Sequence, residues 1–497
     1  MTTRRVLLHC NAGGGYGMGH LMRSIALADE ALFQGWQAAL VGDVSDAAQT
    51  RAARLVPGLE IDPVAPRGLE ASLRAHAATA DLVHLDSYWD VPDLTGGAAV
   101  VSNMQDGPYG ARPADLAIDA NLGAETWFER PDVSSFHLAG VDAAVIRRQV
   151  LQQRDATSDT HERFRILVVM GGADPGGLTT HVAEALAVLP AAFDVTVIVA
   201  ETAHDAIAAA FGGTAHDLTQ LTFAEDLPAL ARAHDLVISA AGTSVWDFAS
   251  MGVPMALICA VDNQRRGYRA AIDAGLAIPL GEPPHSDLSE RMSAVYAVAH
   301  DPTWAAAQRD HLRSTVDGRG AWRIVSAWEQ LVERPADRFG DSGELAARPA
   351  VAGDAQTLFD WRNDETTRLN SRSQEPLSWD GHVGWLERCL ADPQRILLMV
   401  GDSAGDVATV RWDRRAEFDW EVSITVAPQH RGRRLGRAVL AAGERALDVP
   451  GPVRMLAGIH HDNAASRRLF RGAGYLPHQP ADADGFEMLA KWRLPVR

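Results

Sequence analysis

The stretch RRVLLHCNAGGGYGMGHLMRSIALADEALFQ, residues 4–34, decides how the chain begins to fold. Its first part, RRVLLHC at 4–10, is an apolar run of strand length, and five glycines follow within residues 13–19. Residues 21–34 then repeat apolar side chains at helical spacing, at Leu21, Ile25, Ala28 and Leu32. A strand, a glycine loop and a helix in this order predict the opening of an α/β unit.

The glycine loop leads directly to His20 at the start of the predicted helix. Such a loop exposes backbone amides, and the N-terminus of a helix favours an anion. The loop is not a Walker loop, because no Lys-Ser/Thr pair follows it, and it does not cleanly fit the dinucleotide-binding fingerprint. His20 either caps the helix or has a chemical role, and the spacing alone leaves both interpretations open.

The composition limits the classes of partner. A chain of 497 residues is expected to form two to four domains, and 47% hydrophobic with 22% charged residues is typical of a soluble globular protein. The formal charge of −18 argues against nucleic acid or an anionic membrane as the main partner. Any bound phosphate must therefore be met by local loops and arginines.

Neither the cysteines nor the apolar runs predict a disulfide framework or a membrane segment. Cys10, Cys259 and Cys389 lie far apart, without metal-ligand spacing. The first apolar run is too short for the core of a signal peptide, and no apolar span reaches 18 residues. We expect a cytoplasmic protein, and the sequence makes no prediction of its oligomeric state.

The opening pattern occurs twice. Strands are predicted near 38–42, 82–86, 99–102 and 116–119, and a polar stretch at 152–165 then interrupts the alternation. The pattern restarts at ILVVMGGADPGG (166–177), with a helix at about 178–189, strands near 194–199 and 236–239, and a helix after AAGTSVWD (240–247). This predicts two facing Rossmann-like domains, at 1–150 and 151–332, with a cleft between them.

The chain changes character after residue 332. Residues 333–347 are polar, contain proline and glycine, and are predicted to be a linker. Helices are then expected near 354–362 and 379–390, followed by the strand-rich segments ILLMVG, VATVRW and DWEVSITVAP and by a helix after QHRGRRLG. Residues 348–497 are therefore predicted to form a separate α+β domain.

The segment SAAGTSVWDFASMGVPMALICAVDNQ, 239–264, is the most informative part of the second half. Gly242, Thr243 and Ser244 at a helix N-terminus offer amides and hydroxyls to a diphosphate. Asp247 lies one turn further on, where it either accepts hydrogen bonds from a ribose diol or simply complements the helix dipole. Both interpretations stay open.

Taken together, the motifs carry a resemblance. GYGMGHLMRS (G-x-G-H-x-x-R), DSYW at 86–89, AAGTSVWD (G-T-S-x-W-acid) and DNQ at 262–264 resemble the UDP-sugar hydrolases of pseudaminic acid biosynthesis. These are relatives of MurG-type glycosyltransferases with the two-domain GT-B fold, and the similarity spans about 4–325. Members release UDP from a 2,4-diacetamido-2,4,6-trideoxy-altrose nucleotide by adding water at the anomeric carbon. Asp247 stands where the family usually has glutamate.

The resemblance implies a role for each matching residue. His20 would be the base that activates water, Tyr88 and Asn263 would position the sugar, and Asp86 would hold His20 or Tyr88 unless it is a structural strand-end residue. No metal is required in principle, because amides and arginine can hold the charge of UDP. The residues implied to bind the nucleotide or the sugar are Gly17, Gly19, Arg23, Asp86, Gly171, Gly172, Gly242, Thr243, Ser244, Asp247 and Gln264.

The third segment resembles another family. VSITVAPQHRGRRLGRAVL (422–440) is similar to the acetyl-CoA loop of GNAT N-acetyltransferases, and NAASRRLFRGAGY (463–475) to their second motif. Arg434 stands where glycine is typical, and we expect it to be tolerated with a helical backbone. The residues implied to bind acetyl-CoA are Val426, Arg431, Gly432, Arg433, Arg434, Leu435, Gly436, Asn463 and Ser466.

The acid and base of the acetyltransferase are less clearly marked. Phe470 replaces the tyrosine that many GNAT enzymes use as general acid, and Tyr475 is no simple substitute. Glu421 is either a base acting through water or a surface carboxylate. DWRNDETTR at 360–368 resembles the substrate-side opening of GNAT enzymes that acetylate amino sugars.

The sequence thus predicts a bifunctional sugar-nucleotide enzyme. The GNAT domain would acetylate the 4-amino group of a UDP-amino-sugar with acetyl-CoA, and the GT-B-like region would hydrolyse the product to free sugar and UDP. Two alternatives stay open, a MurG-like glycosyltransferase and a nucleotide-sugar-binding regulator. The absence of an obvious basic-aromatic cluster in residues 1–150 favours water as the acceptor.

Overall fold

The computed structural model describes residues 3–13, 16, 18–127, 134, 136–155, 161–171, 174–285, 287–333, 345–369, 371 and 373–494. It divides into two compact units, Met1–Val325 and Ser326–Arg497. The first unit contains two parallel sheets, which we call the first and second domains, and the second unit contains one largely antiparallel sheet. The exact domain boundaries predicted above, at 150, 332 and 347, stay predictions.

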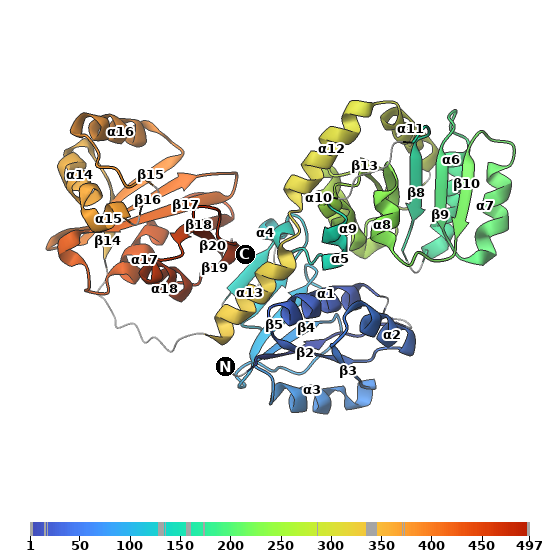
Figure 1. Cartoon of the computed structure of the whole chain (residues 1–497), viewed down its shortest axis with the longest axis horizontal. Coiled ribbons are helices and arrows are strands. Elements are labelled where there is room, and N and C mark those ends of the chain that lie inside the picture. Colours follow the sequence, from blue (N-terminus) through green and yellow to red (C-terminus); the bar gives the residue numbers. More distant parts are fainter. Residues whose placement is uncertain are drawn as a thin grey trace. The chain divides into compact units, whose positions relative to one another are not determined.

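The first domain is built on a seven-stranded parallel sheet of order β3-β2-β1-β4-β5-β6-β7 (Figure 1). Its interior strand RVLLH is almost entirely buried, as expected for a parallel strand covered on both faces. The strands are β1 (Arg5–His9), β2 (Gln37–Gly42), β3 (Glu60–Pro63), β4 (Leu82–Asp86), β5 (Val100–Gln105), β6 (Leu116–Asp119) and β7 (Phe136–Ala139). The predicted strands are confirmed, whereas β3 and β7 were not predicted.

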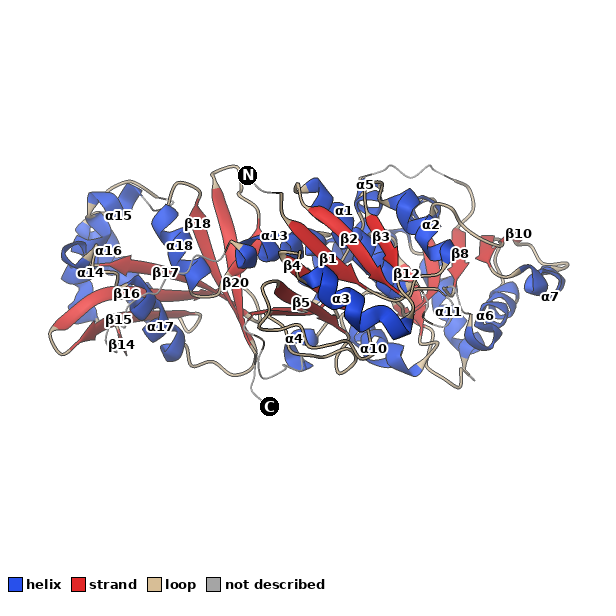
Figure 2. Cartoon of the chain, turned by 90° about the horizontal axis from the view of Figure 1, so that it is seen from below, coloured by secondary structure: helices blue, strands red, loops and turns tan. Residues whose placement is uncertain are grey.

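The helices of the first domain cover both faces of its sheet (Figures 1 and 2). The chain moves outward from β1 to β3 and then returns to β4, so right-handed crossovers place helices on opposite faces. The glycine loop ends two residues earlier than predicted, because the first helix already begins at Gly19. The helices are α1 (Gly19–Phe33), α2 (Asp46–Leu55), α3 (Leu69–Ala77), α4 (Ala124–Trp127) and α5 (Arg148–Gln152).

The second domain repeats this topology. Its six parallel strands have the order β10-β9-β8-β11-β12-β13, which matches β3-β2-β1-β4-β5-β6 of the first. The strands are β8 (Arg165–Val169), β9 (Asp194–Ile198), β10 (Asp217–Leu221), β11 (Leu236–Ala240), β12 (Met255–Ile258) and β13 (Ile278–Pro279). The helices are α6 (Leu178–Ala187), α7 (His204–Phe211), α8 (Leu227–Arg232), α9 (Ser244–Met251), α10 (Arg265–Asp273), α11 (Leu288–Ala299) and α12 (Pro302–Thr315). The prediction of two Rossmann-like halves is confirmed.

Both faces of the second sheet carry a hydrophobic core. Along β8, Ile166 and Val168 belong to one buried cluster, and Leu167 and Val169 belong to another. Successive side chains of a strand point to opposite faces, so an uninterrupted apolar run fills both clusters at once. The uninterrupted apolar run at residues 166–169 therefore predicts a strand that is buried on both faces.

Helix α13 (Gly320–Val332) ties the end of the first unit to the first domain. The guanidinium of Arg323 is almost fully buried, forms an ion pair with Asp317 at 2.6 Å, and donates a hydrogen bond to the carbonyl of Asp142. A buried arginine needs such partners, because its unpaired charge would be costly. The chain therefore returns to the first domain after completing the second.

The second unit has a seven-stranded sheet of order β14-β15-β16-β17-β18-β20-β19. Neighbouring strands in this sheet are antiparallel except β17 and β18. These two pair in parallel over a short stretch, Asp419–Glu421 of β17 with Arg454–Leu456 of β18. The strands are β14 (Ala346–Pro349), β15 (Arg395–Asp402), β16 (Gly405–Arg414), β17 (Asp419–Val426), β18 (Val453–His460), β19 (Leu476–Gln479) and β20 (Phe486–Arg493). The helices are α14 (Ala355–Asn363), α15 (Glu365–Leu369), α16 (Trp379–Ala391), α17 (Gly436–Ala446) and α18 (Ala464–Gly472), which confirms the predicted α+β character.

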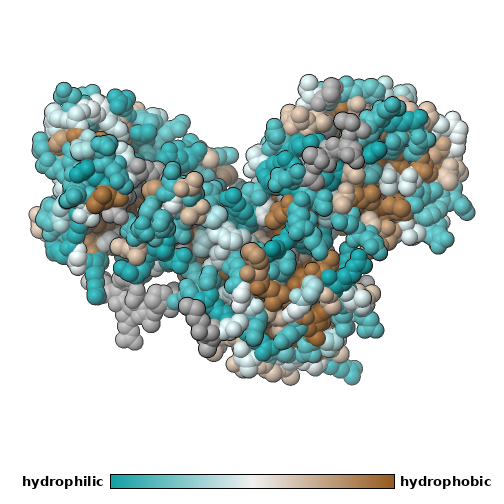
Figure 3. Space-filling model, viewed as in Figure 1, coloured by the Kyte–Doolittle hydropathy of each residue, from teal (hydrophilic) through white to brown (hydrophobic). Residues whose placement is uncertain are grey.

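The face of the molecule shown in Figure 3 is predominantly polar. Hydrophilic residues cover most of the face shown in Figure 3, and hydrophobic residues gather there in a few patches. Within the described part of the chain, no helix combines the length and the apolar character needed to cross a bilayer.

Candidate functional site

The topology brings the first two candidate residues together. In the first sheet, β1 lies between β2 and β4, so consecutive crossovers leave in opposite directions at the β1–β4 boundary. Ligands of such sheets bind beyond the carboxyl ends of the strands at this switch point. His20 follows β1 on α1, and Asp86 is the last residue of β4. Two residues far apart in the sequence therefore meet at one edge of the sheet.

His20 is held by Asp86 and does not cap the helix. Helix α1 has Met18 as its N-cap, without a capping side-chain hydrogen bond, so the capping interpretation of His20 is wrong. Nδ1 of His20 lies 2.6 Å from Oδ1 of Asp86. Because a carboxylate only accepts, Nδ1 carries the proton and donates it, which leaves the lone pair on Nε2. This is the tautomer that a general base needs.

Arg23, one turn after His20, binds the same carboxylate. Its Nε donates to Oδ2 of Asp86 at 2.9 Å, and its Nη2 donates to Oδ1 at 2.7 Å. Burial alone would raise the pKa of Asp86, but the Arg23 guanidinium and the hydrogen bond from His20 hold it well below its ordinary value. Asp86 is thus a buried, ionised partner of His20, which is one of the two roles predicted for it.

Tyr88 is held by a different acid, which the sequence reasoning missed. Its hydroxyl donates to Asp106, and Nη1 of Arg23 donates to the same carboxylate at 2.9 Å. The Tyr88 ring meets the His20 ring edge-on, with centroids 4.4 Å apart. Burial and the Asp106 carboxylate raise the pKa of Tyr88, so its hydroxyl stays protonated. Tyr88 therefore lies beside His20, and its role in positioning the sugar stays a prediction.

Exposed aromatic rings surround this pair. Tyr109 lies 5.8 Å from Tyr88 between ring centroids, and Trp89 meets Tyr16 edge-on at 4.8 Å. Arg112 donates from Nη2 to the carbonyls of Ser87 and Trp89, which fixes the loop after β4. Aromatic faces with polar tips suit a ligand that has both apolar and hydrogen-bonding groups.

The motif of the second domain faces the start of helix α1. Helix α9 begins at Ser244, and its N-cap Thr243 makes no capping side-chain hydrogen bond. A methyl group placed on Gly19, the first residue of α1, would just reach Oγ1 of Thr243, at 3.9 Å, so the start of α1 lies about one methyl group away from Thr243. A methyl group on Gly242 would lie 3.8 Å from Nε2 of Gln264. Gly19, Gly242, Thr243, Ser244 and Gln264 are thus brought together.

Asp247 already has a partner in this structure. Oδ2 of Asp247 lies 3.1 Å from Nη2 of Arg147, from the segment that joins the two domains. Burial raises the pKa of Asp247, and Arg147 opposes this shift. Asn263 is exposed in the 3₁₀ turn Asp262–Gln264, away from any described contact with His20. The roles of Asp247 and Asn263 stay predictions.

The loop after β8 is only partly described. Gly171 is exposed with φ +83°, and a methyl group on it would meet nothing within 4 Å. A left-handed glycine with open space beside it allows close approach of a ligand. The predicted residues Gly172 and Gly17 lie outside the described residues.

The acetyl-CoA loop contradicts one expectation. After β17, which ends at Val426, Gly432 has φ +75° and Arg434 has φ +59°. Arg434 therefore has a left-handed backbone, and the prediction of a helical one is wrong. The physical reason is that this position of the loop demands positive φ, which explains why glycine is typical there. Leu435 and Gly436 then begin α17.

Several side chains of the predicted acetyl-CoA site already have protein partners. Arg431 pairs with Asp364 and donates to Oγ1 of Thr367, both at 2.6 Å. Asn463 accepts from the backbone N–H of Ser466 at 3.0 Å and so caps α18. Arg433 lies 2.7 Å from Nδ1 of His430. Contacts of these residues with acetyl-CoA stay predictions, and the backbone amides of the loop are the better candidates.

Glu421 lies at the point where β17 and β18 part. It is the last residue of β17 that pairs with β18, opposite Leu456, and its carboxylate accepts from Nε of Arg415 at 2.7 Å. The position suits a base, but the carboxylate is already engaged in an ion pair with Arg415. Tyr475 is fully buried against Phe470, which excludes it as a directly acting acid in this conformation.

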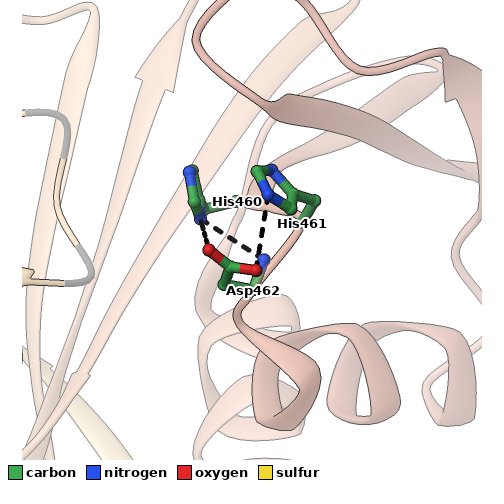
Figure 4. A group of neighbouring side chains, drawn as sticks. All are labelled: His460, His461 and Asp462. Atoms are coloured by element: carbon green, nitrogen blue, oxygen red, sulfur yellow. Dashed lines mark hydrogen bonds and ion pairs between the residues drawn. The ribbon is translucent and has the colours of Figure 1, made fainter.

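One group of the described residues has the spacing of metal ligands. His460, His461 and Asp462, at the end of β18, each place a ligand atom within 4.8 Å of the others (Figure 4). His461 and Asp462 are exposed, and the backbone N–H of Asp462 donates to Nδ1 of His460 at 3.3 Å. This bond occupies the lone pair that a metal would need, so we assign no ion to the group.

Comparisons with known proteins identify two parts of the chain. Residues 344–476 match the acetyltransferase (GNAT) domain, and residues 166–267 match the C-terminal domain of glycosyltransferase family 28. An uncharacterized protein of Methanocaldococcus jannaschii is 20% identical over 384 residues, which are 74% of this chain and 74% of that protein. Phosphinothricin N-acetyltransferase of Streptomyces viridochromogenes is 31% identical over 148 residues, 28% of this chain and 79% of the enzyme.

Among solved structures, MurG of Acinetobacter baumannii aligns with a TM-score of 0.47 and 16% identity, covering 66% of this chain and 99% of MurG. The predicted fold class is confirmed by the two parallel Rossmann-like sheets and by the GNAT match. The chain joins a glycosyltransferase-type region, which implies a nucleotide-sugar substrate, to a GNAT acetyltransferase domain with acetyl-CoA as co-substrate.

Proposed function

We propose that the protein is a bifunctional enzyme of pseudaminic (nonulosonic) acid biosynthesis. Its first unit hydrolyses UDP-2,4-diacetamido-2,4,6-trideoxy-β-L-altropyranose to free sugar and UDP. Its GNAT domain acetylates the 4-amino group of the preceding UDP-amino-sugar. The observation that carries the hydrolase proposal is the buried His20–Asp86 pair beside Tyr88, opposite the Thr243 loop of a glycosyltransferase-type domain.

The hydrolysis uses His20 as general base. Nε2 of His20 takes a proton from water while the water oxygen bonds to the anomeric carbon. The bond from that carbon to the diphosphate oxygen breaks, and UDP leaves with the electron pair. Asp86 stabilises the imidazolium that forms, and the amides of residues 242–244 hold the charge of the leaving diphosphate. No step requires a redox change.

The acetyl transfer uses the amine of the sugar as nucleophile. The amine nitrogen bonds to the thioester carbonyl of acetyl-CoA, the carbon–sulfur bond breaks, and CoA leaves as a thiolate that takes up a proton. The nitrogen loses a proton, for which Glu421 acting through water is the candidate base. Amides of the loop at 431–436 hold the pyrophosphate of CoA.

A glycosyltransferase is the second candidate, and the match of residues 166–267 to glycosyltransferase family 28 favours it. The same base would then deprotonate a hydroxyl of a sugar acceptor. The two reactions differ only in the nucleophile that attacks the anomeric carbon, so the experiment must vary the acceptor.

The test is UDP release from candidate UDP-sugars, with and without acetyl-CoA, in ¹⁸O-labelled water. We expect rapid release of unlabelled UDP from the diacetamido nucleotide, because cleavage at the sugar carbon leaves the bridging oxygen on UDP. Release that requires an added sugar acceptor would establish the glycosyltransferase instead. Binding of the nucleotide without any turnover would point to a regulatory protein.

A further inference from the structure

Asp106, whose side chain is 22% exposed, is the hub of the site, although no motif marks it. It follows β5, and its backbone forms a tight turn with Tyr109 through hydrogen bonds of 3.0 and 3.2 Å. Its carboxylate accepts from Nη1 of Arg23 at 2.9 and 3.1 Å, from the hydroxyl of Tyr88, and from Nδ2 of Asn121 at 3.1 Å. It therefore connects both residues that approach the reacting sugar, Tyr88 directly and His20 through Arg23.

The charges of this network do not balance at rest. Burial alone would raise the pKa of Asp106, but Arg23 and the Tyr88 hydroxyl hold it below its ordinary value, so Asp106 is ionised like Asp86. Two carboxylates and one guanidinium leave one negative charge in excess while His20 is neutral. When His20 takes a proton, the group becomes neutral overall. A buried group without net charge is the more stable one.

We propose that Asp106 is a positioning residue that promotes proton uptake by His20 through Arg23 and holds Tyr88 against the imidazole. The inference rests on the proposed hydrolysis, because only a base that must accept a proton benefits from the extra negative charge. Asp86 orients the ring and fixes its tautomer. Asp106 supplies the charge that Arg23 would otherwise cancel.

Other ionisable groups surround the network, and they constrain the test. Burial lowers the pKa of His9 and of His84 to about 4, so both are neutral near pH 7. Burial raises the pKa of the Cys10 thiol to about 12, and Arg112 carries a fixed positive charge. Burial also raises the pKa of Asp119 to about 6, so Asp119 titrates in the working range and needs its own control.

The decisive variants are Asp106→Asn and Tyr88→Phe. Asp106→Asn removes the charge and keeps the shape, whereas Tyr88→Phe removes one hydrogen bond to Asp106 and keeps the charge. We expect the acidic limb of the pH profile of kcat/KM for UDP release to move to lower pH by about one unit in Asp106→Asn, since a neighbouring charge commonly shifts a titration by that order. Tyr88→Phe should leave the midpoint of this acidic limb unchanged, because the charge of Asp106 is kept. Asp119→Asn should not reproduce the shift.

A direct titration separates this inference from the proposed reaction. The ring protons of His20 are followed by NMR in the full chain with labelled histidine and are assigned by their loss in His20→Gln. Their midpoint should fall in Asp106→Asn even if no nucleotide is hydrolysed, and failure of hydrolysis alone would overturn only the proposed function. An unchanged or raised midpoint in folded Asp106→Asn would overturn the inference. If that variant misfolds, Asp106→Ser, which leaves room for water, must show the same fall.

Discussion

The two switch points of the first unit have the same topology and carry different side chains. In the first sheet, the carboxyl ends of β1 and β4 gather His20, Arg23 and Asp86 into a buried charged network. In the second sheet, the loops after β8 and β11 present Gly171 and the amides around Thr243, with few charged groups among the described residues.

The difference teaches that the topology decides where a ligand binds and the side chains decide what happens to it. A network that holds a lone pair on Nε2 is suited to move a proton, whereas amides at a helix N-terminus are suited to hold an anion. We therefore expect variants at the first switch point to change kcat, and variants at the second to change KM.

The largest expected effect is that of His20→Ala. Loss of a general base should lower kcat for UDP release by roughly 10² to 10⁴-fold and leave UDP binding nearly unchanged. The matched control is His76→Ala, because His76 also pairs with an aspartate, Asp62, on the same domain. Steady-state kinetics and calorimetry with UDP check both. A change in KM alone for His20→Ala would contradict the assignment of the chemical step to the first switch point.

The next effect concerns the sugar, which we expect the first switch point to recognise. The unacetylated 4-amino sugar brings an ammonium beside His20 and Tyr88, and its positive charge opposes the proton that His20 must take up during the reaction. Its hydrolysis should be slower than that of the acetamido sugar by about tenfold to a hundredfold in kcat/KM. Acetyl-CoA should restore UDP release in the intact protein. Equal rates for both nucleotides would contradict a site selective for the acetylated sugar.

A smaller effect is expected at the second switch point. Asp247→Ala should raise KM by about tenfold with little change in kcat, because a ribose contact is made equally in the ground and transition states. Asp205→Ala is the control, since Asp205 also lies in the first turn of a helix of this domain. A fall confined to kcat would assign Asp247 to the chemical step. The second switch point would then not be limited to binding the nucleotide.

The smallest effect extends the comparison to the loop of the GNAT domain, where a side chain has replaced glycine. Arg434→Gly should stabilise the second unit by about 0.5–1 kcal/mol, because glycine adopts the left-handed conformation without strain. Calorimetry should show its Tm raised by about 2–4 °C per kcal/mol. Arg433→Gly, at the neighbouring exposed arginine without positive φ, should give no gain. A lower Tm for Arg434→Gly would show that Arg434 makes compensating contacts.

Much of the fold could be predicted, because strands buried on both faces appear as uninterrupted apolar runs. The strand β3, EIDP, is short, polar and only partly buried, so nothing in its pattern marked it. The strand β7, FHLA, is equally short. Arg434 was misread although its motif contained the signal, since a position that favours glycine often requires positive φ.

The candidate site was predicted only as far as its motifs reach. His20, Tyr88 and Asp86 stand in quoted motifs, whereas Asp106 becomes visible only when β5 is known to lie beside β4. The partner of Asp247 is Arg147, which lies 100 residues earlier in the chain, in the segment that joins the two domains. Ion pairs between residues distant in the sequence have no periodicity, so a single sequence cannot reveal them.

The position of β1 inside its sheet, between β2 and β4, also affects how the protein is made. Val6 pairs with Leu82, so the strand cannot be completed before β4 has been synthesised, whereas β15 pairs directly with β16 across a short turn. Protein synthesis adds about 5–20 residues per second, so roughly 4–16 s pass between the synthesis of the apolar segment RVLLH and that of its partner β4. Non-local parallel pairing is also slow in itself. The first unit, more than the second, should therefore depend on chaperones during synthesis.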